Sequence, residues 1–296
     1  SKIAVINPNL SEGFTRKVGD QARSIVGANT DIIALNPQFG PASIEGYYDE
    51  AFASVGLLSV IRDLEAAPDH IANPIGGYVV ACFDDTGVDA ARCLTSAPVL
   101  GLCEGALRMA AAVASRFAIV TPMPVSVRPL EHLVAKYGAS SQCVVRAAGV
   151  RTLDFEGDGA DAAYQALKKQ AKASLTEDRS EAIVLGCAGM TDIADRLKDE
   201  LGVPVIDGVS AAVKMVEAMA MLGLAPARSE LMPARRLRRI MECFLVSPHK
   251  AEQRALSFVL GPVRPVPDGD AWRLLRVWGH AVQSHQQFRG VADLGH

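Results

Sequence analysis

The chain has 296 residues, of which 49% are apolar and 21% are charged, as in ordinary globular proteins. This composition excludes a disordered chain, a collagen and a coiled coil. The net charge of −3, from 30 basic and 33 acidic residues, lacks the basic field that a nucleic-acid partner requires. No run reaches about 18 uncharged apolar residues, so we expect no membrane span. Residues 1–5 enter a strand pattern at once, which leaves no room for a signal peptide, so we expect a cytoplasmic protein.

Apolar runs alternate with segments of helical spacing throughout residues 1–225. We expect strands at 3–6, 31–35, 78–81, 99–102, 117–120, 144–147, 182–185 and 203–206. We expect helices at 15–26, 50–66, 87–94, 104–115, 127–137, 160–174, 192–201 and 210–222. Strands that alternate with helices indicate an α/β fold with parallel sheets covered on both faces.

The second half of this pattern resembles the first. The segment YVVAC, which ends at Cys82, matches IVLGC, which ends at Cys187, and PVL at 98–100 matches PVI at 204–206. We therefore expect two similar lobes with four-stranded parallel sheets. The first lobe would hold residues 1–115 together with 210–228, and the second would hold residues 116–209.

The composition changes near residue 229. Residues 231–296 hold ten Lys or Arg against five Asp or Glu, both Trp and four of the six His. This stretch has no clear periodicity, so we assign residues 229–296 to an atypical basic C-terminal extension and give it no role.

Strand ends predict where a ligand binds. In open parallel sheets, ligands bind outside the carboxyl ends of the strands. Two lobes that face each other would bring together the residues that follow these strands, which are Asn7, Phe39, Cys82, Thr121 and Cys187. We therefore expect the active site in the cleft between the lobes.

Cys82 and Cys187 are the candidate catalytic residues. Each follows a strand and precedes a predicted helix, where free backbone N–H groups and the positive end of the helix dipole favour a thiolate. Two cysteines at matched positions fit a racemase, in which one thiolate removes a proton from a carbon and the opposing thiol returns one from the other face. Backbone amides would hold the enolate, so no cofactor and no metal are needed. The alternative is a pair of buried core cysteines.

The other cysteines are expected to be free thiols without a catalytic role, because none forms a C-x-x-C motif and none has zinc-finger spacing to a histidine. They are Cys93, Cys103, Cys143 and Cys243. Cys103 closes a predicted strand of the first lobe, so it is the one that could also reach the cleft.

Five motifs together resemble the aspartate/glutamate racemase superfamily, and most closely its hydantoin racemase branch. They are VINPNLS at 5–11, GPASIEGYYD at 40–49, ACFDDTG at 81–87, VLGCAGM at 184–190 and VPVIDGV at 203–209. The resemblance implies two flavodoxin-like lobes, Cys82 and Cys187 as the proton-transfer residues, and cofactor-independent racemisation of 5-monosubstituted hydantoins. It also implies a homo-oligomer.

The resemblance further implies a set of residues that contact the substrate. They are Asn7, Phe39, Gly40, Ser43, Phe83, Asp84, Thr121, Ala188 and Gly189. Several of these have plain structural alternatives. Asn7 would orient Cys82 or bind a ring carbonyl, or only form a turn; Phe39 would wall the substituent pocket or belong to the core. Ser43 would bond the substrate or fix its loop.

Two features depart from the family pattern. The stretch PMPVSVR at 122–128 is richer in proline than in relatives, so this side of the pocket is expected to differ. Relatives end near residue 235–245, so the segment 231–296 departs from the family pattern, and its arginine cluster at 235–239 is interpreted as a solvated basic helix rather than a polyanion site.

Rival functions remain open at this stage. Allantoin is itself a substituted hydantoin, so an allantoin racemase differs only in substrate profile. An aspartate or glutamate racemase is disfavoured because the Asp-Ser-Gly that usually ends the first strand is Asn7-Pro8-Asn9 here. Arylmalonate decarboxylation needs only the second cysteine, and maleate isomerisation has low weight. The non-enzyme alternative is a two-lobed small-molecule sensor.

Overall fold

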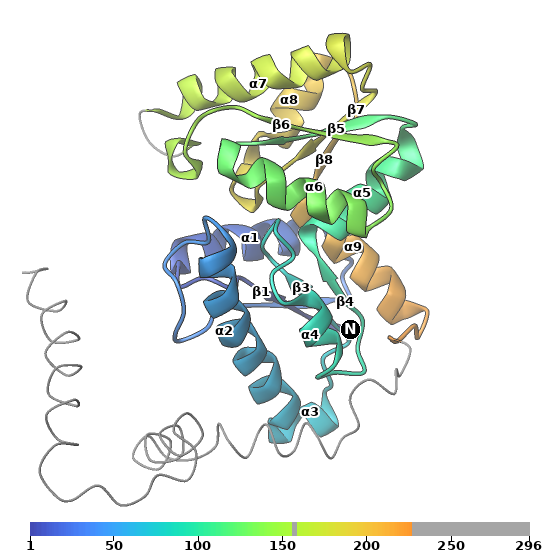
Figure 1. Ribbon diagram of the computed structural model, residues 1–296. Coiled ribbons are helices and arrows are strands. Elements are labelled where there is room, and N and C mark those ends of the chain that lie inside the picture. Colours follow the sequence, from blue (N-terminus) through green and yellow to red (C-terminus); the bar gives the residue numbers. More distant parts are fainter. Residues whose placement is uncertain (156–158, 227–296) are drawn as a thin grey trace, which may run out of the picture. The chain divides into compact units, whose positions relative to one another are not determined.

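The computed structural model describes residues 1–155 and 159–226, which form two four-stranded parallel sheets (Figure 1). The first sheet contains β1 (Lys2–Ile6), β2 (Asp31–Leu35), β3 (Gly77–Val80) and β4 (Val99–Gly101). The second contains β5 (Phe117–Thr121), β6 (Cys143–Ala147), β7 (Ala182–Leu185) and β8 (Val205–Asp207). Their orders, β2-β1-β3-β4 and β6-β5-β7-β8, are the same, which confirms the predicted α/β fold with two similar lobes.

Helices connect the strands in both lobes. They are α1 (Glu12–Ile25), α2 (Tyr47–Ala66), α3 (Pro68–Ala72), α4 (Val88–Arg92), α5 (Leu102–Val113), α6 (Val127–Lys136), α7 (Ala160–Glu177), α8 (Ala194–Leu201) and α9 (Gly208–Met221). The described residues also form the 3₁₀ helices η1 (Pro124–Ser126), η2 (Thr152–Phe155) and η4 (Ala188–Ile193). The helix expected at 192–201 is thus divided into η4 and α8, and the short α3 was not predicted.

The strands are continuous apolar runs because both faces of each sheet are buried. Along β1, Ile3 and Val5 belong to one core cluster, whereas Ala4 and Ile6 belong to another. The first of these clusters also contains Phe117 of β5, so it spans both lobes. The outer faces of the two sheets have separate cores, packed by α2 and α4 in the first lobe and by α7 and α8 in the second.

Helices α1, α5 and α9 join the two lobes. Helix α5 contacts β4 of the first sheet and also β7 and β8 of the second. Helix α9 packs against α5, α1 and β3, and α1 contacts η4 of the second lobe. Asp207 begins α9 as its N-cap, where its carboxylate accepts hydrogen bonds from the backbone N–H groups of Val209 and Ser210 at 2.9 and 3.1 Å.

Within the described ranges, no helix has both the length and the apolar character needed to cross a membrane. The predicted extension, residues 229–296, lies outside the described residues. The predicted lobe boundaries, 1–115 with 210–228 and 116–209, stay predictions.

Candidate active site

One cavity of about 460 Å³ contains both candidate cysteines. Cys82 and Cys187 follow the ends of β3 and β7 at the same spacing, and each of these is the third strand in the order of its sheet. The cavity is of the size usual for small-molecule sites. Its lining consists of Asn9, Ser11, Phe14, Ala42, Ser43, Ile44, Glu45, Ala81, Cys82, Phe83, Asp84, Thr121, Pro122, Met123, Ser126, Arg151, Thr152, Gly186, Cys187, Ala188 and Gly189.

Cys187 is held at the start of a helical turn. It is the N-cap of η4, and the backbone N–H of Gly189 donates a hydrogen bond to its Sγ at 3.4 Å. This N–H and the Thr152 hydroxyl both favour the thiolate, but burial raises the pKa of the Cys187 thiol above its usual value. The amide that favours the anion is therefore present, as the sequence predicts, while desolvation outweighs it.

Cys82 lies in a different local structure from Cys187. The residues after it form a turn, and the next helix, α4, begins only at Val88 and has five residues. Burial and the negative charge of Asp84 raise the pKa of the Cys82 thiol well above its usual value, against smaller opposing effects of Thr86 and the Asp84 amide. No helix starts directly after Cys82, so the helix dipole that the sequence analysis expects to favour its thiolate does not act beside it.

Asp84 is the acidic group of the cavity that acts on both thiols. Burial raises the pKa of its own carboxyl to about 6. Its charge raises the pKa of Cys82 and of Cys187 alike. The Asp84 side chain therefore affects the electrostatics of both thiols, in addition to lining the cavity.

Six of the nine residues expected to contact substrate line the cavity with the cysteines. They are Ser43, Phe83, Asp84, Thr121, Ala188 and Gly189. Ala188 and Gly189 follow Cys187 directly, and Thr121 ends β5, where its hydroxyl donates to the Gly186 carbonyl at 3.4 Å. The rule that places a ligand at the carboxyl ends of parallel strands accounts for these positions.

Asn7 is not among the lining residues, although it directly follows β1. It is fully buried, and its Nδ2 donates to Asn9 Oδ1, to the Ser11 carbonyl and to Thr15 Oγ1 at 2.8–3.1 Å. Its Oδ1 accepts from the Asn9 N–H. Asn7 therefore shapes the turn that presents Asn9 and Ser11 to the cavity, which is the structural alternative of the sequence analysis.

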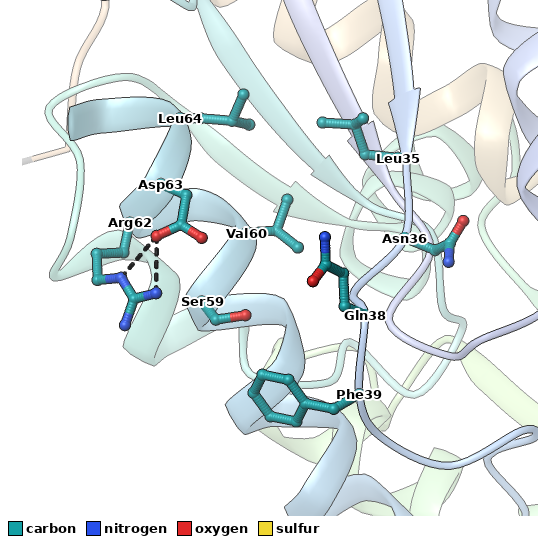
Figure 2. A pocket seen from close by; sticks show the side chains of 9 residues that line it. All are labelled: Leu35, Asn36, Gln38, Phe39, Ser59, Val60, Arg62, Asp63 and Leu64. Carbon is teal, nitrogen blue, oxygen red and sulfur yellow. Dashed lines mark hydrogen bonds and ion pairs between the residues drawn. The ribbon is translucent and has the colours of Figure 1, made fainter. Parts of the chain in front are cut away.

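Phe39 and Gly40 also lie away from the cysteines. Phe39 is 50% exposed and lines a separate hollow between the end of β2 and α2, beside Val60 and Arg62 (Figure 2). Gly40 has a φ of +139°, a conformation that favours glycine, and it lies at the turn before the cavity loop. The strand β2 is at the edge of its sheet, so the residues directly after it lie to one side of the cysteine cavity. Only the later loop residues 42–45 line that cavity.

Sequence reasoning missed a group of lining residues. They include Asn9, Phe14, Ile44, Glu45, Met123, Arg151 and Thr152. Arg151 and Thr152 follow β6, and the strand-end rule that named a residue after β2 would also have pointed to the loop after β6. The proline-rich departure at 122–128 does contribute to the lining, through Pro122, Met123 and Ser126.

The other described cysteines are free thiols outside this cavity. Cys103, the one that was expected to be able to reach the cleft, is fully buried in the first turn of α5. Its backbone N–H donates to Asp85 Oδ1 at 2.9 Å. Among residues 1–155 and 159–226, no group of three His, Cys, Asp or Glu side chains is arranged to hold a metal ion.

Known proteins match this chain over most of its length. The model of the Asp/Glu/hydantoin racemase family matches residues 3–216. Hydantoin racemases from Rhizobium meliloti and Paenarthrobacter aurescens are each 43% identical, over 76% and 75% of this chain and 91% and 92% of theirs. A solved allantoin racemase from Klebsiella pneumoniae is 42% identical with a TM-score of 0.72, covering 79% of this chain and 94% of that one.

The two-lobed fold and these relatives define an enzyme of the isomerase class, a racemase. The chain belongs to the Asp/Glu/hydantoin racemase family, which confirms the resemblance found in its motifs.

Proposed function

We propose that this protein interconverts the enantiomers of 5-monosubstituted hydantoins by proton transfer between Cys82 and Cys187, without a cofactor. One cysteine, as thiolate, takes the proton from the chiral ring carbon. The electron pair of the broken C–H bond moves onto the neighbouring carbonyl oxygen as an enolate, and the opposite thiol then donates its proton to the other face. The second cysteine is left as thiolate, ready for the reverse reaction.

The observation that carries this proposal is that both thiols line one cavity from equivalent strands of two similar lobes. Burial raises the pKa of each thiol, so the thiolate that takes the substrate proton is a stronger base than that of an exposed cysteine. Backbone N–H groups that follow the cysteines are the donors for the enolate oxygen.

The cavity lining supports a substrate with an apolar substituent. Phe14, Ile44 and Met123 contribute hydrocarbon surface to it. Such surface suits the alkyl or aryl group of a hydantoin, whereas its ring carbonyls need polar donors.

A second candidate is an allantoin racemase, whose substrate carries a polar ureido substituent. Glu45 and Arg151 also line the cavity, and the allantoin racemase from Klebsiella pneumoniae is about as similar to this chain as the hydantoin racemases are. Arg151 is held by Asp154, with Nη2 at 2.7 Å from Oδ1, so it is oriented but already has a partner. The predicted homo-oligomer and cytoplasmic location stay predictions.

A single assay tests the substrate class. We expect the optical rotation of L-alkylhydantoins and L-arylhydantoins to decay to zero with the purified enzyme and no added cofactor. Allantoin and L-glutamate are measured in parallel at the same concentration. Faster decay with allantoin would replace the first candidate by the second. Decay with glutamate alone would overturn both, and binding of hydantoins without any loss of rotation would favour the sensor.

Replacement of Asp84 by asparagine should move the pH dependence of racemisation. Above about pH 6 the Asp84 carboxylate is ionised, and its negative charge opposes loss of a proton from either thiol. The asparagine side chain lacks this charge, so the thiol pKa values should fall and the rising limb of the kcat/KM profile should move to lower pH by roughly one unit. Exposed Asp195, replaced by asparagine, is the matched control. A profile that stays in place, or moves to higher pH, would contradict the assigned effect of Asp84.

A further inference from the structure

A lysine of the first lobe holds the cysteine loop of the second. Lys17 of α1 donates from Nζ to the Gly189 carbonyl at 2.6 Å and pairs with Asp192 Oδ1 at 3.0 Å. Gly189 is the residue whose N–H donates to Cys187 Sγ. Phe14 of α1 lies against the same glycine, since a Cβ there would come within 3.2 Å of the Phe14 ring. Helix α1 therefore determines where the hydrogen-bond donor of Cys187 lies.

A tyrosine of the second lobe holds the cysteine loop of the first in a corresponding way. Tyr137, at the end of α6, donates its hydroxyl to Asp85 Oδ2 at 2.7 Å. Asp85 is three residues after Cys82, and its backbone N–H donates to the Cys82 carbonyl at 3.2 Å. Its carboxylate also accepts from the N–H groups of Cys103 and Glu104 at 2.9 Å, so it ties the turn after Cys82 to the start of α5.

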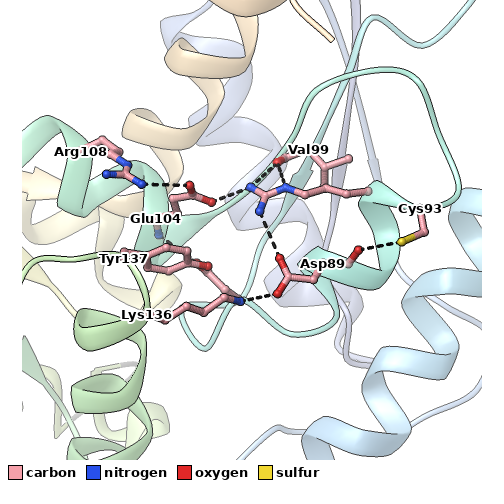
Figure 3. A network of polar contacts seen from close by, with 9 residues as sticks. Asp89, Cys93, Val99, Glu104, Arg108, Lys136 and Tyr137 are labelled. Carbon is pink, nitrogen blue, oxygen red and sulfur yellow. Dashed lines mark hydrogen bonds and ion pairs between the residues drawn. The ribbon is translucent and has the colours of Figure 1, made fainter. Parts of the chain in front are cut away.

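An ion-pair network reinforces this second contact (Figure 3). Lys136, next to Tyr137, pairs with Asp89 Oδ2 of α4 at 2.7 Å. Arg92 of α4 forms ion pairs with Asp89, Nη1 to Oδ1 at 3.2 Å, and with Glu104 of α5, Nη2 to Oε2 at 2.6 Å. Helix α4 is therefore held both to α5 and, through Lys136, to the opposite lobe.

The two contacts are equivalent in the two lobes, because α1 follows β1 and α6 is the first α-helix after β5. We propose that each cysteine is positioned by this helix of the opposite lobe, with Lys17 as the positioning residue of Cys187 and Tyr137 as the positioning residue of Cys82. This inference rests on the proposed two-cysteine function. In this proposal, the contact of Lys17 with the Cys187 loop and that of Tyr137 with the Cys82 loop affect the rate at which each thiol exchanges a proton with the substrate.

Slowing one cysteine changes the isotope effects of the two enantiomers differently, although it changes their kcat/KM values equally. The equilibrium constant of a racemisation is one, so slowing either cysteine lowers kcat/KM equally in both directions. The isotope effect differs, however. If the transfers of one cysteine are slowed, the enantiomer that it deprotonates loses its own proton in the slow step, and its primary deuterium isotope effect rises. The other enantiomer loses its proton in a fast, reversible step, and its isotope effect falls towards the equilibrium isotope effect of proton transfer from carbon to sulfur.

The test compares isotope effects for both enantiomers of one alkylhydantoin, protonated or deuterated at the chiral carbon. Lys17→Met should lower kcat/KM about ten-fold, the effect of one charge-assisted hydrogen bond. It should raise the isotope effect for the enantiomer that Cys187 deprotonates and lower it for the other. Tyr137→Phe should show the opposite pattern. Lys17→Arg, which keeps a cationic donor, should restore most of the wild-type behaviour, and Lys172→Met on the exposed face of α7 is the control.

The enantiomer of each cysteine is assigned from Cys82→Ser and Cys187→Ser, which should each exchange the proton of a single enantiomer in deuterium oxide. If either serine variant racemised at the wild-type rate, the proposed function would fall, and this inference with it. If the serine variants behaved as expected but the isotope effects of Lys17→Met and Tyr137→Phe moved in the same sense for both enantiomers, only the positioning roles would be overturned.

Discussion

Cys82→Ser and Cys187→Ser should each lose racemisation by at least about a hundred-fold, because a serine hydroxyl is far too weak an acid to replace a thiol in proton transfer. Both side chains line the same cavity, so each variant keeps the other thiol in contact with the substrate. In deuterium oxide each variant should therefore exchange the chiral proton of one enantiomer without inverting it. Polarimetry measures the inversion, and mass spectrometry measures the exchange.

Cys93→Ser is the matched control for the two serine variants. Cys93 is also a partly exposed free thiol, but it lies at the end of α4 and does not line the cavity. Its replacement should leave racemisation within about two-fold of wild type, the scatter of a neutral substitution. Wild-type racemisation in either Cys82→Ser or Cys187→Ser would rule out the two-base mechanism.

Gly101→Ala should be the most destabilising small substitution in the first lobe. A Cβ on Gly101 would lie 2.0 Å from Asp85 Oδ1, so the carboxylate would have to leave its place. The N–H groups of Cys103 and Glu104 and the Tyr137 hydroxyl would then lose their acceptor. Leaving the buried Cys103 N–H and the partly buried Glu104 N–H unpaired costs on the order of 2–5 kcal/mol, and urea unfolding measures the loss.

The same substitution at Gly13 is the control for Gly101→Ala. Gly13 is exposed in α1, and the nearest neighbour of an added Cβ is at 3.9 Å, so alanine fits there. Alanine in place of a helical glycine should stabilise the protein by roughly 0.5–1 kcal/mol. If Gly101→Ala unfolded at the same urea concentration as the wild type, Asp85 would not be the anchor of the turn after Cys82.

The strands and the candidate pair of cysteines were predictable because their signals are local. The strand 182–185 agrees with β7 at both ends, since a four-residue apolar run between Glu181 and Gly186 has few other structures open to it. Cys82 and Cys187 were singled out because the two lobes repeat the same pattern. Each cysteine follows the corresponding strand of its lobe, at the carboxyl end of the sheet where ligands bind. The helix 192–201 was predicted as one element because the 3₁₀ turn of η4 has no strong local signature.

The protonation state of the thiols could not be predicted from position alone. The sequence indicates a turn with backbone amides after each cysteine, which favours the thiolate. It does not indicate how far the fold desolvates each sulfur, and burial has the larger effect on both pKa values. The same limit applies to Phe39, whose apolar side chain is equally compatible with the cavity and with the separate hollow beside α2.

By itself, the sequence determined the alternation of strands and helices, the repeat of two lobes and the two cysteines that end equivalent strands, because each depends on residues close together in the chain. Only the tertiary structure decided that Asn7 forms a turn and that Arg151 lines the cavity. It also decided that Lys17 and Tyr137 cross between the lobes to hold the cysteine loops. Those contacts join residues far apart in sequence, and they exist only once the packing of both sheets on α5 and α9 has brought the two lobes together.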